Sequence, residues 1–282
     1  MVKRAPSATE RARGALLGLA AGPAPDPGLS PDTPASRPPA DAALALILAE
    51  ELLAPEIPLE RVVHRWIDWV RRGGEGLDEE SIAALDHLAA YDAPPDGPGA
   101  VGPGPLARCV PIALATAASP RNLVSGTFHT AALTHPDPRS AWSAVAVNVA
   151  LARFVQGRRD FVADVLEALR NNQAPDELVQ AVRRVPLARR DDLPVERAAG
   201  DAVACAEVAL WLAYHEPLVG RGLGWLADRG AGTTAGAVVG ALLGARDGVE
   251  AIPPERLRGV ADAERIGALA ERLLGAWLAS AS

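Results

Sequence analysis

One stretch near the C-terminal end, residues 230–253, constrains the fold more than any other part of the chain. Gly236, Gly240 and Gly244 recur there every four positions, which places them on one face of a helix. Glycine lowers helix stability by roughly 1 kcal/mol relative to alanine, so three glycines in register predict close packing against another helix. Most of the other residues in this helix are apolar. A helix that is apolar nearly all round belongs at the centre of an α-helical protein.

Composition points the same way. The chain has 282 residues, of which 49% are hydrophobic but only 4% aromatic, so its core must consist mainly of Ala, Leu and Val. Ala and Leu favour helices, and we find neither the alternation of a strand nor a repeat of fixed period. We therefore expect an all-α fold in a single domain covering residues 1–282.

Charge and cysteine content limit the partners and the compartment. A net charge of −7 argues against a nucleic-acid-binding protein. No apolar run is long enough to span a bilayer, and no signal peptide is recognisable, so we expect a cytoplasmic protein without a membrane partner. The isolated Cys109 and Cys205 predict neither a disulfide nor a metal site; we expect both to be buried.

Local signals place the helices. Ser7 and Glu10 have the spacing of a capping box and predict that the first helix begins there and runs to Gly22. Loops rich in Pro, Gly, Ser and Asp are expected at residues 22–39 and 94–99. Besides the helix that begins near residue 233, apolar periodicity predicts helices at 40–53, 59–72, 79–90, 120–133, 140–155, 161–171, 176–185, 201–213 and 262–279.

The glycine-rich helix also carries a family resemblance. With its preceding turn and its Ile252-Pro253 tail, it resembles the C-terminal signature of the ADP-ribosylglycohydrolase family, which includes the dinitrogenase-reductase-activating glycohydrolases. In that family the turn reads Gly-Gly-Asp-x-Asp-Thr. Here it falls on residues 229–234, where Ala231 and Thr233 replace the two aspartates and Thr234 is retained.

Other segments follow the family's motif order over nearly the whole chain. The family's (Ser/Thr)-Asp-Asp-Thr falls on residues 39–42, where Asp41 is the one remaining acid. Its Gly-Asn-Gly-(Ser/Ala)-x-Met-Arg segment falls on residues 102–108, with proline in place of the Asn and the Ser. Its Thr-His-x-Asp turn falls on residues 134–137, where Asp137 is expected to cap the helix that begins at Pro138.

The resemblance implies a site with two divalent cations, usually magnesium, which are held between the two acidic motifs. The corresponding ligand positions are residues 39–41, 231, 233 and 234, of which Asp41, Thr233 and Thr234 offer a side-chain oxygen. Two dications require several carboxylates, so we expect no cofactor, or at most one weakly bound ion. The residues that the resemblance assigns to binding an ADP-ribose-like ligand are Gly102, Gly104, Arg108, Thr134 and His135.

Each of these residues also has a structural interpretation. Asp41, Thr233 and Thr234 stand at helix starts, where their oxygens would cap free amides. Arg108 would pair with an acid or a carbonyl rather than bind a phosphate. His135, in a turn before a proline, would either be structural or line the pocket.

Three functions are compatible with the sequence. The first is a catalytically silent member of the family that binds a phosphate-bearing small molecule or a protein partner, aided by helix N-termini that attract anions. The second is an active hydrolase of ADP-ribosyl or related glycosidic bonds that uses other acids, such as Asp26, Asp32 or Asp228. The third is a structural subunit whose proline-rich loops contact a partner.

Overall fold

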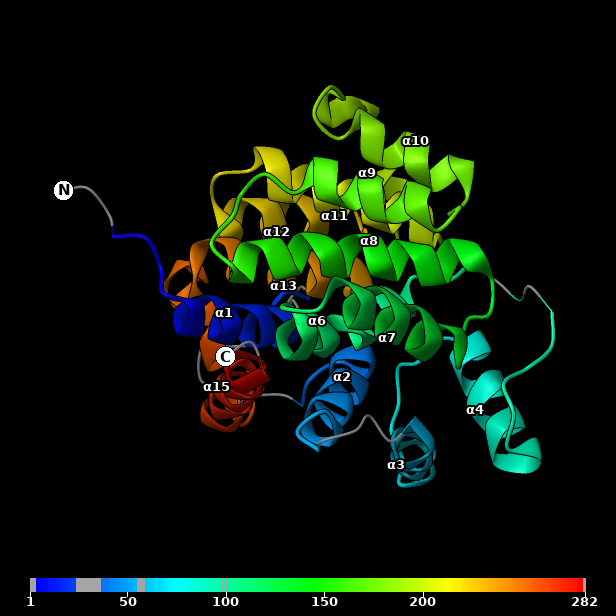
Figure 1. Ribbon diagram of the computed structural model, residues 1–282. Helices are drawn as coiled ribbons and strands as arrows, with labels where there is room; N and C mark the ends of the chain where they lie inside the picture. Colours follow the sequence, from blue (N-terminus) through cyan, green and yellow to red (C-terminus); the bar gives the residue numbers. More distant parts are fainter. Residues whose placement is uncertain (1–3, 24–36, 55–58, 98, 100, 281–282) are drawn as a thin grey trace.

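The computed structural model describes residues 4–23, 37–54, 59–97, 99 and 101–280, and within them it contains helices and no strand. The all-α prediction is therefore confirmed (Figure 1). Three short 3-10 segments lie at Arg190–Asp192, Val195–Arg197 and Val249–Ala251. The α-helices are α1 (Ala8–Ala21), α2 (Ala40–Glu51), α3 (Leu59–Arg71), α4 (Glu79–Tyr91), α5 (Gly104–Arg108), α6 (Val110–Thr116), α7 (Pro120–Ala132), α8 (Pro138–Val155), α9 (Val162–Asn171), α10 (Asp176–Arg184), α11 (Ala202–His215), α12 (Val219–Ala227), α13 (Thr233–Asp247), α14 (Pro254–Arg258) and α15 (Ala263–Ser280).

The glycine-rich helix is α13, and it lies at the centre as expected, with every residue from Ala235 to Arg246 buried. Its partner is α1, which carries glycines at the same four-residue spacing. A Cβ built on Gly18 would lie 2.1 Å from the carbonyl oxygen of Gly240, and one on Gly240 would lie 2.1 Å from that of Gly18. The two helices run antiparallel with their backbones in direct contact. The facing pairs along the crossing are Gly14 with Gly244, Gly18 with Gly240, and Gly22 with Gly236.

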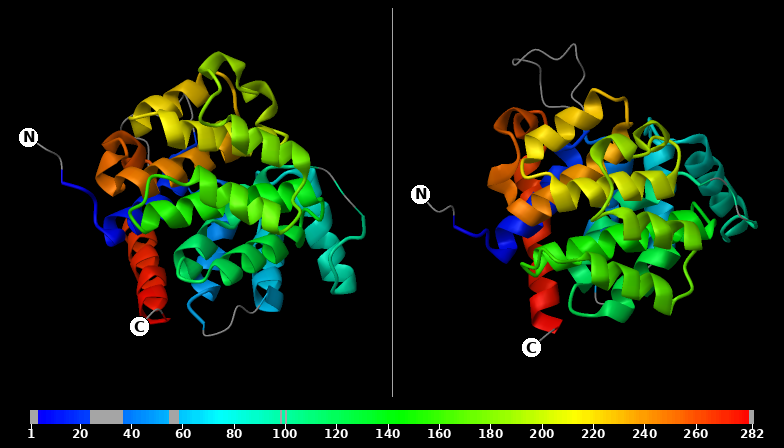
Figure 2. Two further views of the ribbon diagram at one scale, coloured as in Figure 1. Left: turned by 45° about the horizontal axis from the view of Figure 1, so that its top comes forward. Right: turned by 90° about the horizontal axis from the view of Figure 1, so that it is seen from above.

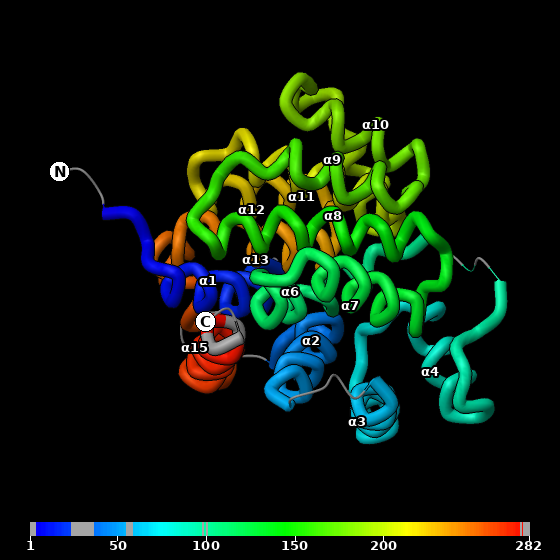
Figure 3. Tube along the Cα trace, viewed as in Figure 1, coloured from blue at the N-terminus to red at the C-terminus, as the bar shows by residue number. Residues whose placement is uncertain are grey.

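Helix α8 is a second central element. Almost all of its residues are buried, because α7, α9, α11 and α13 all pack against it. Figure 1 shows α9 and α10 above α8 and α7 below it. Figure 3 follows the chain from α8 through α9 and α10 to α11 and α12, of which α11 packs directly on α8. Figure 2 shows α15 at the edge of the molecule, where it packs on α1.

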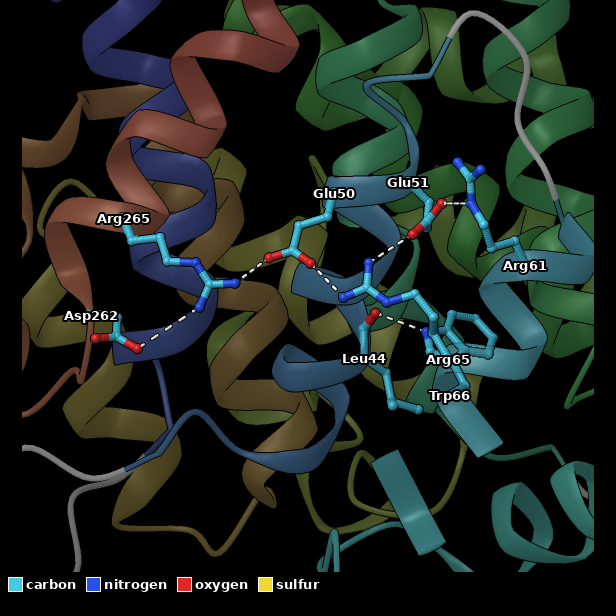
Figure 4. A network of polar contacts seen from close by, with 8 residues as sticks. All are labelled: Leu44, Glu50, Glu51, Arg61, Arg65, Trp66, Asp262 and Arg265. Carbon is cyan, nitrogen blue, oxygen red and sulfur yellow. Dashed lines mark hydrogen bonds and ion pairs between the residues drawn. The ribbon is translucent and has the colours of Figure 1, made fainter. Parts of the chain in front are cut away.

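Helix α2, which bears Asp41 in its first turn, is held in place by charge and by a buried indole (Figure 4). Arg65 of α3 binds both acids at the end of α2, at 2.5 Å from Glu50 and 2.7 Å from Glu51. Trp66 donates from Nε1 to the carbonyl oxygen of Leu44, 2.9 Å away. The full chain of ion pairs joins α3, α2 and α15 and runs through Arg61, Glu51, Arg65, Glu50, Arg265 and Asp262.

The helix boundaries agree with the local signals in most places. The capping box of Ser7 and Glu10 is formed, and Asp137 caps α8. The sequence did not predict α5, α6, α12 or α14. α5 and α6 are short helices with a proline in the first turn, and α12 contains three glycines that weaken its apolar pattern.

Two further predictions can be compared with the structure. Cys109 and Cys205 are both free and buried, as expected. No helix in the described part of the chain combines the length and the apolar character that crossing a bilayer requires. The proline-rich segment at 22–39 lies largely outside the described residues.

Candidate functional site

The N-terminal turns of α2 and α13 meet, although their residues are far apart in the sequence. Thr234, the second residue of α13, donates from its hydroxyl to Oδ2 of Asp41, the second residue of α2, at 2.7 Å. Burial raises the pKa of Asp41, while Arg108 and the Thr234 hydrogen bond act in the opposite direction. The two surviving positions of the family's acidic motifs therefore bind each other.

The prediction that Asp41, Thr233 and Thr234 cap free helix amides is wrong. The N-cap of α2 is Pro39, and Asp41 accepts from a hydroxyl instead of a helix amide. The N-cap of α13 is Gly232, at a φ of +89° that favours glycine, and neither Thr233 nor Thr234 caps the helix. Because the glycine occupies the cap, Thr234 is displaced into the first turn, where its hydroxyl reaches Asp41.

Arg108, at the end of α5, is the centre of the site. Only 1% of its surface is exposed. Its Nη1 donates to the hydroxyl of Ser81 at 2.7 Å and lies 3.4 Å from Oδ1 of Asp41. Its Nη2 donates to the hydroxyl of Thr134 at 3.0 Å. The guanidinium thus joins the starts of α2 and α4 to the turn before α8, and it pairs with an acid as the sequence suggested.

His135 is fully buried beside this guanidinium. Its Nδ1 lies 3.2 Å from Nη2 of Arg108, and since a guanidinium can only donate, Nδ1 must accept. The ring hydrogen is then on Nε2, which faces Oε2 of Glu80 at 3.2 Å and Oδ2 of Asp78 at 3.9 Å. Burial and the neighbouring Arg108 lower the pKa of His135 to about 3, against the opposing effect of Asp78. The imidazole is therefore neutral at physiological pH.

The two glycines assigned to ligand binding have a steric reason to be there. A Cβ on Gly102 would lie 2.6 Å from Nε2 of His135. A Cβ on Gly104 would lie 2.7 Å from Nη2 of Arg108 and 3.2 Å from Oδ1 of Asp41. A side chain at either position would displace the buried imidazole of His135 or the guanidinium of Arg108, so glycine is the residue that leaves this cluster undisturbed.

The structure thus brings together most of the predicted site residues and separates others from them. Thr233 is exposed at the start of α13, where it forms the rim of the cluster together with the exposed Gly232. Asp228 is exposed at the end of α12, and Asp26 and Asp32 lie outside the described residues. The residues in contact with one another, or close enough to exclude a Cβ, are Asp41, Gly102, Gly104, Arg108, Thr134, His135 and Thr234.

Sequence reasoning missed the contribution of α4. Asp78 is the N-cap of α4 and accepts from the amide of Ser81 at 2.6 Å, while Ser81 and Glu80 reach Arg108 and His135. Apolar periodicity did predict that a helix begins at residue 79. It gave no indication that this start faces the turn at 134–137.

The donors at this site do not fit a pair of divalent cations. In the described residues, no group of three or more His, Cys, Asp or Glu side chains is placed to hold a metal ion. The family positions at Ala40, Ala231 and Thr233 carry no carboxylate, and the retained Asp41 is engaged on one oxygen by Thr234 and faces Arg108 with the other. Magnesium requires near-octahedral oxygen coordination, which one such carboxylate does not supply.

The described chain thus has an all-helical core with a polar cluster between the starts of α2 and α13. Comparison with known proteins gives the family. The family model described as ADP-ribosylglycohydrolase matches residues 4–281, and the chain belongs to this family. It is similar to a solved structure described as "ADP-ribosylglycohydrolase-related protein complex", with 27% identity, a TM-score of 0.77, and coverage of 96% of this chain and 99% of the other. No curated protein matches the chain.

Proposed function

We propose that this protein is a member of the ADP-ribosylglycohydrolase family that does not cleave ADP-ribosyl bonds and acts by binding. The observation that carries the proposal is the state of Asp41. This retained carboxylate accepts a hydrogen bond from Thr234 on one oxygen and faces the buried guanidinium of Arg108 with the other. It is not available to anchor metal ions for hydrolysis.

The charge balance supports this proposal. Two divalent cations bring four positive charges, and their hydration is replaced only where several carboxylates converge. Here the retained acid already has a cationic partner, and adding divalent ions beside Arg108 would place like charges together. The family's metal-dependent step has no equivalent in these residues.

The ligand that we propose is a small molecule bearing a phosphate, bound at the open rim of the cluster near Thr233. Thr233 is exposed in the first turn of the 15-residue helix α13, next to the exposed Gly232. Free amides at such a position favour an anion, and the absence of the family's aspartates makes the rim less negative. The protein behind this rim would then be the polar cluster, which keeps the start of α13 in place. It contains the predicted ligand-binding residues Gly102, Gly104, Arg108, Thr134 and His135.

Calorimetric titration and a turnover assay together test this proposal. We expect ADP-ribose or a related nucleotide to bind with the same affinity in magnesium and in EDTA, and Thr233→Asp to weaken binding by charge repulsion. We expect no release of ADP-ribose from an ADP-ribosylated protein. Release of ADP-ribose would favour the active hydrolase, with Asp228→Asn as the first variant to examine. Absence of heat with ADP-ribose, nucleotides and phosphate would refute the ligand.

A protein partner is the second candidate. It is supported by the description of the similar solved structure as a protein complex. Light scattering after size exclusion, with the purified chain alone and with its native extract, would detect such an assembly. A structural subunit would form a defined complex without binding a nucleotide, whereas a chain that stays monomeric in both samples would argue against a partner.

A further inference from the structure

The segment between α10 and α11 presents a leucine to solvent on a rigid support. Leu187 is 84% exposed, although the backbone on both sides of it is held by ring nitrogens of α11. Nε2 of His215 donates to the carbonyl oxygen of Val185 at 2.9 Å. Nε1 of Trp211 donates to that of Ala188, also at 2.9 Å. Single exposed leucines are common on protein surfaces. A leucine on a fixed backbone, however, loses little freedom when it enters a partner, which favours binding.

A cavity of about 440 Å³ lies further along the same segment. Its apolar lining comes from residues 193–195 and from the indole of Trp225 in α12. The guanidinium of Arg190 lies 5.4 Å from the centre of this indole, and that of Arg229 lies 4.5 Å from it. Cations stacked on an aromatic ring are attracted to it and hold it in place. The cavity is therefore preformed and is large enough to receive a branched aliphatic side chain.

The turn between the leucine and the cavity carries exposed charges of both signs. Arg189 precedes the 3-10 helix Arg190–Asp192, and Asp192 ends it. Residues three apart in a 3-10 helix lie on one face, so Arg189 and Asp192 present opposite charges side by side. Both side chains are exposed, and within the described residues neither has an ion pair. Arg190, between them, pairs with the buried Glu216 and anchors the turn to the core.

We propose that this surface binds a second copy of the same chain about a twofold axis. Each Leu187 enters the cavity of the other copy, and each Arg189 pairs with Asp192 of the partner subunit. A twofold axis sets one charged face antiparallel to the other, so the positive end of each turn meets the negative end of its counterpart. Such a contact requires the protruding residue and its cavity to lie on the same surface. Here both belong to residues 187–195.

The charge pattern favours a second copy over an unrelated partner. The chain has a net charge of −7, so two copies repel each other at a distance and associate most readily where the local charges balance. The run Arg189-Arg190-Asp191-Asp192 has two positive and two negative residues, so it is neutral and complementary to an antiparallel copy of itself. This inference goes beyond the proposed function and does not depend on the phosphate-bearing ligand.

Sedimentation equilibrium of the purified chain over a range of concentrations tests the inference. We expect a monomer–dimer equilibrium with a Kd on the order of 10 μM, as for a small interface. Leu187→Ala should weaken the dimer roughly 100-fold, because two leucines leave their cavities in each dimer. Leu278→Ala is the matched control. Leu278 is 51% exposed in α15, outside the proposed interface, and its truncation should leave the Kd unchanged.

Charge reversal tests the twofold pairing. Arg189→Asp and Asp192→Arg should each abolish the dimer, because like charges then face each other twice across the interface. A variant that carries both changes should recover the dimer, since the opposite charges meet again with their positions exchanged. An equimolar mixture of the two single variants should form a heterodimer, because each copy supplies the charge that the other lacks.

Several outcomes would overturn the inference. A chain that stays monomeric up to millimolar concentration has no such interface. A dimer that persists in Leu187→Ala, or in both single charge reversals, is held together elsewhere. Equal Tm values of the variants and the parent at low concentration, where the monomer predominates, show that the variants are folded; if Leu187→Ala is destabilised, the charge reversals decide. These measurements contain no nucleotide and no ADP-ribosylated protein, so their failure is distinct from failure of the proposed binding function.

Discussion

The contact between α1 and α13 makes a quantitative prediction for Gly240→Ala. The added methyl group would lie 2.1 Å from the carbonyl oxygen and 2.9 Å from the carbonyl carbon of Gly18, and 2.8 Å from the Cα of Gly22. These are backbone atoms of a helix, so none can rotate away as a side chain would. Relief requires the two helices to move apart by about 1 Å at a close-packed crossing.

The size of the effect follows from two opposing terms. Overpacking a rigid interior costs about 1–3 kcal/mol and occasionally more, and backbone-on-backbone contact places this site at the upper end. Alanine in place of glycine returns about 1 kcal/mol of helix propensity. We therefore expect Gly240→Ala to lower the free energy of unfolding by about 2 kcal/mol or more.

Gly275→Ala is the matched control. Gly275 is exposed in α15, and a Cβ there would meet no atom within 4 Å. The same substitution should stabilise the protein by about 0.5–1 kcal/mol through helix propensity alone. Urea titrations followed by circular dichroism measure both changes. If Gly240→Ala unfolds at the same or a higher urea concentration than Gly275→Ala, the glycines do not bring the helices into contact and the packing argument is refuted.

Two further predictions concern titratable groups. His135 titrates at about 3 when folded, below its ordinary value of 6.5, so the unfolded chain binds more protons between these values and stability falls as the pH drops through this window. The free energy of unfolding should fall by about 1.4 kcal/mol for each pH unit in this window. His135→Gln should remove this contribution when Tm is measured as a function of pH. The same pH profile in the variant as in the parent would contradict a neutral, buried imidazole. Burial raises the pKa of Cys109 and Cys205 to about 12. A chromogenic disulfide reagent at pH 8 should therefore detect no reactive thiol in the native protein and two after denaturation. Fast labelling of the native protein would contradict this.

The sequence by itself was sufficient for the long helices. The apolar periodicity and the caps at Ser7 and Asp137 are local, and a helix satisfies its backbone hydrogen bonds within one segment. The face defined by Gly236, Gly240 and Gly244 also predicted a close helix partner. Glycine lowers the stability of a helix, so three in register indicate that a neighbouring helix needs the space. α12, with glycines within its apolar pattern, could not be recognised in this way.

The sequence predicted only part of the site. The family resemblance selected Asp41, Arg108, His135 and Thr234, and the structure places each in the same polar cluster. It assigned no role to the start of α4, because nothing in a single sequence couples the Ser81 hydroxyl to a guanidinium 27 residues away.

The sequence alone determined that this chain would form apolar helices around a glycine face, and that its acidic motifs had lost carboxylates. Only the tertiary structure decided that α1 supplies the matching glycines and that the retained Asp41 faces Arg108. The physical reason is the range of the interactions: caps and periodicity act within a turn or two of helix. Packing partners and buried charge pairs depend on which segments the finished core places side by side.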